Sequence, residues 1–341
     1  MKTYDIIIVG AGPAGLRCAE ILSNSSHKVL LLEKNSEIGP KVCAGGLTGK
    51  GMDYLCLPDE LIEFKFDKIK LQVNCLPSII KNHKTFAYTI DRKEFGQWQL
   101  SKLKKSPNVE IKTNAKVSAI TPEYITVNDE KIAYKILVGA DGSNSTVRRY
   151  LGLKTEKVVA AIQYIIPTDR FKNFELYFQP RKFHAGYVWI FPHKNYVSVG
   201  TGCDGKLFST SKLKENFHRW LKNHKIDVTN AKYEAFPINA DYQGYKFNNI
   251  YLLGDAAGLA SGFTGEGIYQ ALISGEEIGK QILNPEYTPD LSRLLRNQQY
   301  HERLYALSNK WGKARVMLYY AGMFLLKYSP KWRAKFIDIV G

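Results

Sequence analysis

The chain has 341 residues, 45% of them hydrophobic and 23% charged, and its formal net charge is +16. This composition is typical of a folded globular protein that is long enough for two subdomains, and it excludes collagen-like and low-complexity chains. No apolar run reaches the roughly 20 residues that a membrane-spanning helix needs. The positive charge suits nucleic acid or anionic lipid, but the lysines are scattered and no recognition motif accompanies them. We therefore expect no nucleic-acid partner.

The five cysteines indicate a reducing compartment. They are odd in number and contain no Cys-x-x-Cys pair, which favours free thiols in the cytoplasm. The first predicted strand begins within the first few residues, so we expect no signal peptide before it. An iron–sulfur cluster needs about four clustered thiolates, and no cysteine follows Cys203. We therefore expect a cytoplasmic protein without a metal site.

Residues 6–33 predict a dinucleotide-binding site. An apolar strand leads into Gly10-x-Gly12-x-x-Gly15, a helix follows, and a second apolar strand ends at Glu33. Gly10 permits the tight turn, Gly12 lets the backbone approach a pyrophosphate, and Gly15 lets the helix pack closely on the strand. The helix N-terminus offers unpaired N–H groups to the phosphates. The Glu33 carboxylate can accept hydrogen bonds from a ribose.

The middle of the chain predicts two kinds of sheet. Strands around residues 68–74 and 85–90 precede a helix that Asp91 caps. Short strands between residues 109 and 138 then return the chain to the first sheet. From about residue 158 to 204, strands follow one another without helices, which indicates an antiparallel sheet. We predict an α/β fold with a discontinuous Rossmann-type domain (1–65, 91–155 and 245–285), an antiparallel β-sheet substrate domain (66–90 and 156–244) and a helical C-terminal segment (286–341).

Two further turns combine glycine with an acid at the end of a strand. Asp141 lies in the first, at residues 139–142. Gly254 and Asp255 form the second, shortly before the glycine-rich start of a helix at residues 262–268. Each alone is explained as an ordinary turn, which Asp-Gly favours. Together with the first glycine turn, and in this order, they predict three parts of one cofactor pocket.

An aromatic stripe precedes two glycines. Tyr187, Trp189 and Phe191 alternate along a predicted strand, so all three side chains face the same way. Gly200 and Gly202 lie on the returning strand and leave space beside the rings. An aromatic wall opposite a strand that carries two glycines leaves a space that suits a long, apolar ligand. The alternative is an ordinary aromatic face in the core.

Together these motifs resemble FAD-dependent oxidoreductases of the para-hydroxybenzoate hydroxylase fold, over roughly residues 4–283. The geranylgeranyl reductase family is a closer match. Its hallmark is Tyr-x-Trp-x-Phe, then seven or eight residues, then Gly-x-Gly, and residues 187–202 are similar. The family also has a Lys-x-Cys-x-Gly-Gly loop, which residues 41–46 resemble, although Val42 and Ala44 stand where proline and glycine are expected. The resemblance implies FAD as the cofactor.

The resemblance also implies which residues form the site. In the resembling enzymes the cysteine equivalent to Cys43 lies by the flavin, where it delivers a proton or places the substrate; the alternative is a small hydrophobe in a loop. Glu33 is expected to hold the adenosine ribose, Arg92 a cofactor oxygen or phosphate, and Asp255 the ribityl-pyrophosphate region. The expected cofactor-binding residues are Gly10, Gly12, Ala14, Gly15, Glu33, Cys43, Ala44, Gly46, Arg92, Val117, Asp141, Gly254, Asp255, Gly265, Gly267 and Ile268. The expected substrate-binding residues are Tyr187, Trp189, Phe191, Gly200 and Gly202.

The implied reaction saturates isolated C=C bonds of a polyprenyl chain, such as a geranylgeranyl group on a lipid or on an isoprenoid diphosphate. Reduced flavin would deliver the hydride. A single nucleotide fingerprint implies that NAD(P)H visits only transiently or that a ferredoxin reduces the flavin. The alternatives are an aromatic monooxygenase or halogenase on the same fold, and a flavin-binding membrane-surface protein that turns nothing over.

The C-terminal segment combines basic and apolar residues. The apolar run at residues 316–326 is too short to span a bilayer, and basic residues that include Lys313 and Lys335 flank it. Such a segment can lie in the interface of an anionic membrane, here at the inner face of the cell membrane. The alternative is a pair of helices docked on the FAD-binding domain.

Overall fold

The first layer of the fold is an eight-stranded sheet with a parallel centre. The computed structural model describes residues 1–206, 209–310 and 314–334, so Lys313 and Lys335 lie outside the described residues. The central strands are buried on both faces, which explains why they read as continuous apolar runs. The strands run in the order β17 (Lys246–Phe247), β18 (Ile250–Leu252), β11 (Glu130–Gly139), β1 (Lys2–Val9), β2 (Val29–Leu32) and β8 (Val109–Lys112), with β10 (Tyr124–Val127) paired to β11 and β9 (Val117–Ile120) paired to β10.

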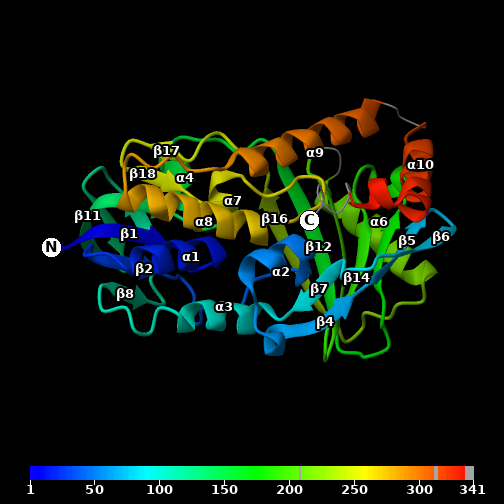
Figure 1. Ribbon diagram of the computed structural model, residues 1–341, viewed down its shortest axis with the longest axis horizontal. Coiled ribbons are helices and arrows are strands. Elements are labelled where there is room, and N and C mark those ends of the chain that lie inside the picture. The colour runs from blue at the N-terminus through cyan, green and yellow to red at the C-terminus, as the bar shows by residue number, and fades with distance from the viewer. Residues whose placement is uncertain (207–208, 311–313, 335–341) are drawn as a thin grey trace.

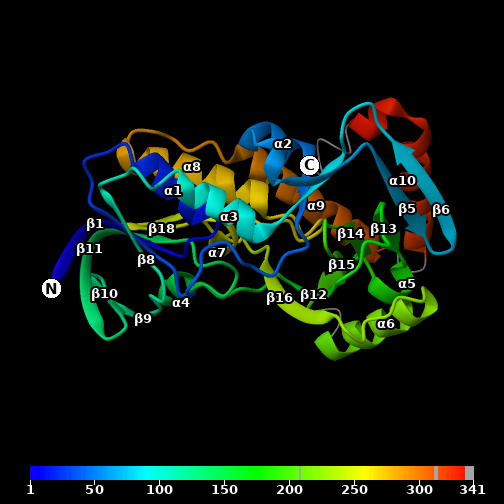
Figure 2. The ribbon, with the colours of Figure 1, turned by 90° about the horizontal axis from the view of Figure 1, so that it is seen from below.

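Helices α1 (Pro13–Leu22) and α8 (Ile268–Leu283) pack side by side on this sheet (Figure 1). Their close approach depends on Gly275, because a Cβ there would lie 2.4 Å from the carbonyl oxygen of Ala14. Helix α3 (Arg92–Ser101) lies next to α1, as Figure 2 also shows. The Asp91 carboxylate accepts hydrogen bonds from the first backbone N–H groups of α3, so the predicted cap is confirmed.

The second layer is a seven-stranded sheet that is mainly antiparallel. β5 joins it in parallel register, with Phe174 opposite Ile69, so a segment from early in the chain completes a sheet made later. Helix α6 (Thr210–Asn223) covers one face of this sheet with Phe217 and Trp220. The strands run in the order β16 (Lys232–Asn239), β12 (Val158–Ile166), β15 (Val197–Asp204), β14 (Val188–Pro192), β13 (Phe174–Phe178), β5 (Lys68–Val73) and β6 (Leu76–Lys81).

Two details of the second sheet differ from the prediction. Strand β6 was not predicted; it pairs with β5 across a tight turn in which Asn74 has a φ of +52°. Asparagine tolerates this left-handed conformation better than most residues. A short helix, α5 (Pro180–Phe183), interrupts the region that was expected to hold strands alone. Pro180 stands at its first turn, where a missing N–H costs nothing.

Smaller elements connect the two layers. A three-stranded sheet and the helix α2 (Gly49–Leu55) lie between the ends of the two large sheets (Figure 1). The strands of the small sheet are β3 (Gly46–Thr48), β7 (Ala87–Ile90) and β4 (Ile62–Phe66), which follows the 3-10 turn η1 (Asp59–Leu61). The remaining helices are α4 (Thr146–Tyr150), α7 (Gly254–Ala257), α9 (Ser292–Lys310) and α10 (Arg315–Tyr328).

Helix α10 docks on the second sheet, not on the first. It buries Met323 and Leu326 in the apolar cluster beside β5 and β6. The expected alternative of a helix pair docked on the FAD-binding domain is therefore wrong for α10, because its apolar face matches the aromatic cluster of the second sheet. None of the helices in the described parts of the chain has the length and apolarity needed to cross a membrane.

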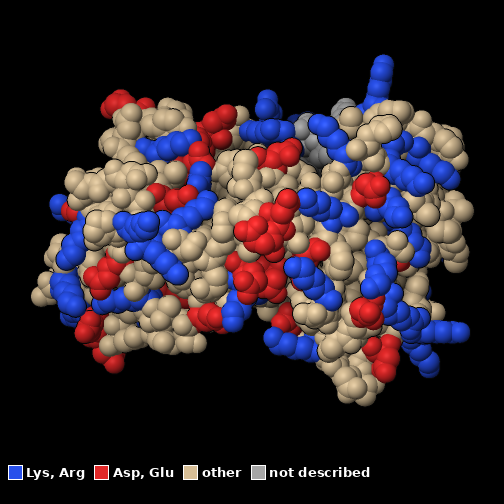
Figure 3. Space-filling model, turned by 60° about the horizontal axis from the view of Figure 1, so that its bottom comes forward, with Lys and Arg blue, Asp and Glu red and all other residues tan. Residues whose placement is uncertain are grey.

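Lysine and arginine side chains are spread widely over the face that Figure 3 shows, while acidic side chains gather near its middle. A surface that binds nucleic acid usually concentrates basic residues in a patch or along one helix. The distribution on this face has no such stripe, in agreement with the scattered lysines of the sequence.

Candidate active site

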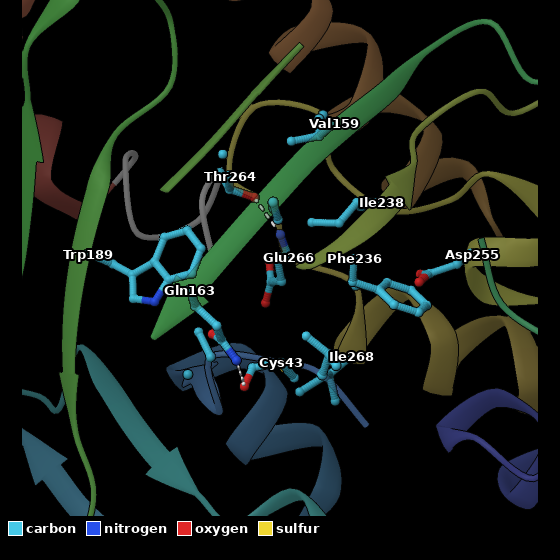
Figure 4. A pocket seen from close by; sticks show the side chains of 18 of the residues that line it. Cys43, Val159, Gln163, Trp189, Phe236, Ile238, Asp255, Thr264, Glu266 and Ile268 are labelled. Atoms are coloured by element: carbon cyan, nitrogen blue, oxygen red, sulfur yellow. Dashed lines mark hydrogen bonds between the residues drawn. The ribbon is translucent and has the colours of Figure 1, made fainter. Parts of the chain in front are cut away.

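A cavity extends from the glycine turn after β1 to the aromatic strand β14 of the second sheet. It encloses about 2120 Å³ that protein atoms do not fill, part of it open to solvent. Figure 4 shows that side chains from both halves of the molecule point into it. The predicted site residues that line it are Gly12, Ala14, Cys43, Ala44, Gly46, Arg92, Tyr187, Trp189, Phe191, Gly202, Asp255, Gly265, Gly267 and Ile268.

The three glycines of the first turn have distinct surroundings. Gly10 has a φ of +103°, and a Cβ there would lie 2.5 Å from the carbonyl oxygen of Ala140. A Cβ on Gly15 would lie 2.0 Å from the carbonyl oxygen of Gly10. A Cβ on Gly12 would meet no protein atom within 4 Å, because Gly12 faces the open cavity. Gly12 also precedes α1, whose N-terminus has no side-chain cap, so its first N–H groups suit a phosphate.

Glu33 lies beside this turn, at the end of β2. Its Oε2 accepts a hydrogen bond of 3.1 Å from the backbone N–H of Ala11. The N–H of Ala115 donates to the carbonyl oxygen of Glu33 at 2.8 Å, which brings the segment that leads to Val117 next to the acid. The Val117 side chain itself is buried in the core of the first sheet. The contact of Glu33 with the adenosine ribose and that of Val117 with the cofactor remain predictions.

Arg92 carries the strongest sign of a missing ligand. The residue is 7% exposed and lines the cavity, and its Nε and Nη1 atoms have no hydrogen-bond partner among the residues that the structure describes. Its guanidinium lies over the ring of Phe95, 5.5 Å from the ring centroid. A buried cation without acceptors is strongly destabilising. The site therefore fits a bound group that supplies oxygen acceptors, such as the phosphates of a dinucleotide.

Replacing Arg92 with methionine is expected to weaken FAD while sparing the empty protein. Methionine keeps much of the buried volume and removes an unpaired charge, so the melting temperature of the apoprotein should stay level or rise. A lost charged hydrogen bond costs about 1.5–3 kcal/mol, so FAD affinity should fall roughly 10- to 100-fold. Titration followed by flavin fluorescence measures the FAD affinity, and melting curves measure the stability of the apoprotein. The exposed Arg149→Met is the control. Unchanged FAD affinity would contradict the assignment.

Asp255 also lines the cavity, next to Gly254. Its Oδ2 is 3.2 Å from both Lys41 Nζ and Ser143 Oγ. Gly254, just before it, packs its backbone against Ala271 of α8, where a Cβ would lie 3.1 Å from the alanine Cβ. Helix α8 begins after Gly267 and has no side-chain cap. A second uncapped helix N-terminus therefore points at the same space.

Asp141 is turned away from the cavity. Its Oδ2 accepts hydrogen bonds from the backbone N–H groups of Thr146 and Val147, at 2.6 and 3.4 Å. Burial raises the pKa of this carboxyl group above its ordinary value. Asp141 therefore supports the start of α4, while its neighbours Ala140 and Gly142 line the cavity. Its expected contact with the cofactor remains a prediction.

The loop that contains Cys43 is held against the second sheet. The carbonyl oxygen of Cys43 accepts a 3.3 Å hydrogen bond from Gln163 Nε2, and its Sγ accepts one of 3.4 Å from the N–H of Gly45. The carbonyl oxygen of Ala44 is 3.0 Å from His193 Nε2. A Cβ on Gly46 would lie 2.8 Å from the ring of Phe191. The loop thus reaches the cavity despite its two departures from the family pattern.

Trp189 is the centre of the aromatic wall. Its Nε1 donates to Ser198 Oγ at 2.9 Å, and Ser198 Oγ donates to Gln163 Oε1 at 3.0 Å. Its ring lies over Gly200, where a Cβ would be 2.2 Å from the ring. Gly200 therefore makes room for the tryptophan, whereas Gly202 lines the cavity directly.

The other two aromatic residues extend this wall in both directions. The Tyr187 hydroxyl donates to the carbonyl oxygen of Thr264, in the loop before α8. The Phe191 ring stacks on Phe174 with centroids 3.9 Å apart. The wall therefore joins the cofactor end of the cavity to an apolar end, which is lined by Ile69 of β5 and by Phe174 and Leu176 of β13.

Glu266 is a cavity residue that the sequence analysis missed. Its Oε1 accepts a 2.8 Å hydrogen bond from Thr48 Oγ1. Burial raises the pKa of its carboxyl group from an ordinary 4.5 to about 7. An acid between two glycines, Gly265 and Gly267, at the start of an apolar helix was the available signal. The family resemblance implies cofactor contacts for the neighbouring Gly265, Gly267 and Ile268 but not for the Glu266 side chain.

Two family models match the chain. The model described as "Glucose inhibited division protein A" matches residues 5–177, and the one described as "FAD binding domain" matches residues 108–283. Both matches include the glycine-acid turn around residue 141, and the first includes the glycine turn after β1. The unpartnered Arg92 and the two uncapped helices fit that cofactor. The protein is thus an FAD-dependent oxidoreductase.

Relatives narrow the class to one family. The chain is 31% identical to an uncharacterised protein of Methanosarcina barkeri, over 81% of this chain and 73% of that one. It is 29% identical to a digeranylgeranylglycerophospholipid reductase of Methanocaldococcus jannaschii, over 82% of this chain and 78% of the relative. A geranylgeranyl bacteriochlorophyll reductase-like protein of Thermoplasma acidophilum shares its fold, with a TM-score of 0.77, 22% identity, and 99% and 100% of the chains covered. The chain belongs to the geranylgeranyl reductase family.

The fold itself is shared more widely. A flavin-dependent brominase aligns with a TM-score of 0.70 at 16% identity, over 99% of this chain and 93% of the brominase. At this identity the likeness shows the fold alone, because one fold hosts many reactions.

Proposed function

We propose that the protein saturates isolated C=C bonds of a polyprenyl chain, such as a geranylgeranyl group on a lipid or an isoprenoid diphosphate. The observation that carries this proposal is the apolar extension of the cavity beyond the FAD-binding residues. Its walls are aromatic and aliphatic, as a long hydrocarbon without polar handles requires. The name of the Methanocaldococcus jannaschii relative, a digeranylgeranylglycerophospholipid reductase, supports the same substrate class.

In the proposed reaction, FAD and the residues of the chain have different roles. Bound FAD, once reduced, supplies a hydride. The residues of the chain bind the alkene, align it with the flavin and exclude water. The wall formed by Tyr187, Trp189 and Phe191 holds the hydrocarbon along β14. The Cys43 loop closes the space between this wall and the cofactor end, so Cys43 places the alkene beside the flavin. We further propose that NAD(P)H binds transiently, or a ferredoxin docks, to reduce the flavin.

The direct test uses the FAD-loaded enzyme, dithionite as reductant and geranylgeranyl diphosphate as the probe. Mass spectrometry should find products heavier by two hydrogens for each bond reduced, formed equally well without oxygen. Hydroxylated or halogenated products that require O₂ would favour the monooxygenase or halogenase alternative, which shares the fold. A protein that binds FAD and lipid but forms no product would instead be a non-catalytic binder.

We also propose that a peripheral contact with an anionic membrane delivers the substrate at the inner face of the cell membrane. The inner side of α10 packs into the cluster that contains the cavity residues Ile69 and Phe174. Its outer side is apolar and exposed, and Lys327 and Lys331 accompany it. Such a surface suits a lipid interface rather than water. The exposed apolar side chains here are Met317, Phe324 and Tyr328 of α10, Trp332 after it, and Leu76 and Ile79 of β6, which α10 contacts.

Replacing Phe324 with aspartate is expected to release the protein from anionic vesicles. The side chain is 62% exposed, so the change should cost little stability. Removing a buried phenylalanine from the lipid contact costs about 1.5–3 kcal/mol, which is roughly tenfold or more in binding. Vesicle binding is measured by co-sedimentation with vesicles of phosphatidylglycerol and phosphatidylcholine at low and high salt. Leu283→Asp, at the far end of α8, is the control; equal sedimentation of both variants would refute the contact.

A further inference from the structure

Glu266 is fixed in place by its backbone. Its carbonyl oxygen accepts a 2.8 Å hydrogen bond from the N–H of Ser261, and its own N–H donates to Thr264 Oγ1 at 3.3 Å. Gly265, before it, has a φ of +72°, and Gly267, after it, begins α8. Figure 4 shows the side chain in the middle of the cavity, with Trp189 on one side and Phe236 and Ile268 on the other.

This position is the junction of the two halves of the cavity. On one side of Glu266, Thr264 accepts the hydroxyl of Tyr187 from the aromatic wall. On the other side, Gly267 and Ile268 form the uncapped helix start that faces the cofactor end. A carboxyl group here therefore lies between the cofactor end of the cavity and its aromatic wall.

The surroundings of Glu266 favour its neutral form. Burial opposes ionisation and outweighs the hydrogen bonds from Thr48 and Gln270 and the charge of Lys50, which act in the opposite direction. At neutral pH a substantial fraction of the Glu266 carboxyl groups therefore carries a proton. Burial also raises the pKa of the nearby Tyr187 hydroxyl, so that phenol holds its proton more tightly than usual.

Two other carboxylates that line the cavity have closer cations, and Asp204, which also lines it, accepts hydrogen bonds from the Tyr305 hydroxyl and from the N–H of Lys206. Asp255 Oδ2 lies 3.2 Å from Lys41 Nζ, and Glu234 Oε1 lies 2.8 Å from Lys232 Nζ. The thiol of Cys43 also faces the cavity, but a thiol is ordinarily a weaker acid than a carboxylic acid. Glu266 is thus the acid of this cavity best suited to give up a proton at neutral pH.

We propose that Glu266 is the catalytic acid that protonates the alkene; this inference rests on the proposed function. An isolated alkene has no conjugated group to accept the electrons of an incoming hydride. One alkene carbon gains the hydride from reduced flavin, the π bond breaks, and the other carbon gains the Glu266 proton. The two electrons that the alkene gains would be supplied with the hydride by reduced flavin, and Glu266 becomes a carboxylate that water reprotonates before the next turnover.

The activity test compares Glu266→Gln with Glu123→Gln. Glutamine keeps the shape and can still accept from Thr48, but it has no acidic proton. With geranylgeranyl diphosphate and dithionite, Glu266→Gln should lower kcat at least ~100-fold, since general acids typically contribute 10²–10⁴-fold. FAD content should not change. Wild-type kcat should fall as the pH rises through about 7, and the residual rate of Glu266→Gln should lack that step. Glu123, exposed in the turn between β9 and β10, should behave as wild type.

A second measurement does not depend on turnover. The Glu266 pKa is raised on folding, so the unfolded chain loses its proton near pH 4.5 and the folded protein near pH 7. Its contribution to stability is therefore greatest below pH 4.5, declines up to about pH 7 and stays constant above. The melting temperature of Glu266→Gln minus that of the wild type should rise across this window. A flat difference would show that Glu266 is not protonated in the fold.

The outcomes separate the two proposals. If the wild type reduces the probe and Glu266→Gln does so equally with the same pH profile, Glu266 is not the acid and the proposed function stands. Loss of activity with FAD lost and the fold destabilised at every pH would mean a structural role and would also overturn the inference. A wild type that reduces no prenyl probe overturns the proposed function and this inference with it.

Discussion

Replacing Gly12 with valine is expected to give a folded but colourless protein. The residue has a φ of −76° and a ψ of −177°, which valine adopts readily, and a Cβ there meets no protein atom within 4 Å. The new side chain instead occupies the space that the FAD pyrophosphate needs. An overpacking cost of ~3 kcal/mol or more corresponds to roughly 100-fold weaker FAD or worse. Flavin absorbance of the purified protein and its circular dichroism measure the two parts of this expectation.

Gly15 provides the matched contrast. A Cβ there would lie 2.0 Å from the carbonyl oxygen of Gly10, so Gly15→Val should disrupt the turn itself and lower the yield of folded protein. A yellow Gly12→Val protein with normal FAD affinity would show that the cofactor does not approach this turn.

Replacing Trp189 with alanine is expected to abolish most alkene reduction while FAD stays bound. The ring forms the middle of the wall, and its loss opens the space above Gly200. The indole N–H also ends the chain of hydrogen bonds that runs through Ser198 and Gln163 to the carbonyl oxygen of Cys43. Truncating a buried aromatic costs about 3–5 kcal/mol, so melting temperature and flavin content must be measured together with product formation.

Two companion variants separate positioning from folding. Trp189→Phe keeps most of the wall without the hydrogen bond and should retain much of the activity. Cys43→Ser should lower turnover while reduction of the flavin by dithionite remains normal. If Trp189→Ala instead loses stability and FAD together, and residual activity follows the folded fraction, the stripe is an ordinary core face. Full activity in a well-folded Trp189→Ala enzyme would exclude the wall as a substrate site.

The parts of the site that the sequence predicted depend on local rules. The roles of Gly10 and Gly15 follow from the tight turn and from the helix that packs on it, and both have the surroundings that those roles require. The alternation of Tyr187, Trp189 and Phe191 follows from strand geometry, and all three line the cavity. Such inferences need no knowledge of distant segments.

The parts that were missed depend on contacts between distant segments. Glu266 accepts from Thr48, 218 residues away, and its burial results from walls that strands of the second sheet and of the small three-stranded sheet supply. The docking of α10 on β5 and β6 could not be predicted either, because an apolar helix face indicates that the helix packs on another surface but does not identify that surface. The predicted cofactor contact of Asp141 stays a prediction, because a carboxylate at a strand end has the same sequence whether it faces a ligand or accepts hydrogen bonds at the start of α4, as Asp141 does.

The parallel pairing of β5 with β13 affects how the chain folds during synthesis and how it responds to proteolysis. The first sheet takes strands from residues 2–32, 109–139 and 246–252, whereas the second takes them from 68–81, 158–204 and 232–239. A ribosome must therefore synthesise most of the chain before either sheet can be completed, which delays burial of apolar strands and favours slow folding. For the same reason no single proteolytic cut separates the two sheets into independent fragments.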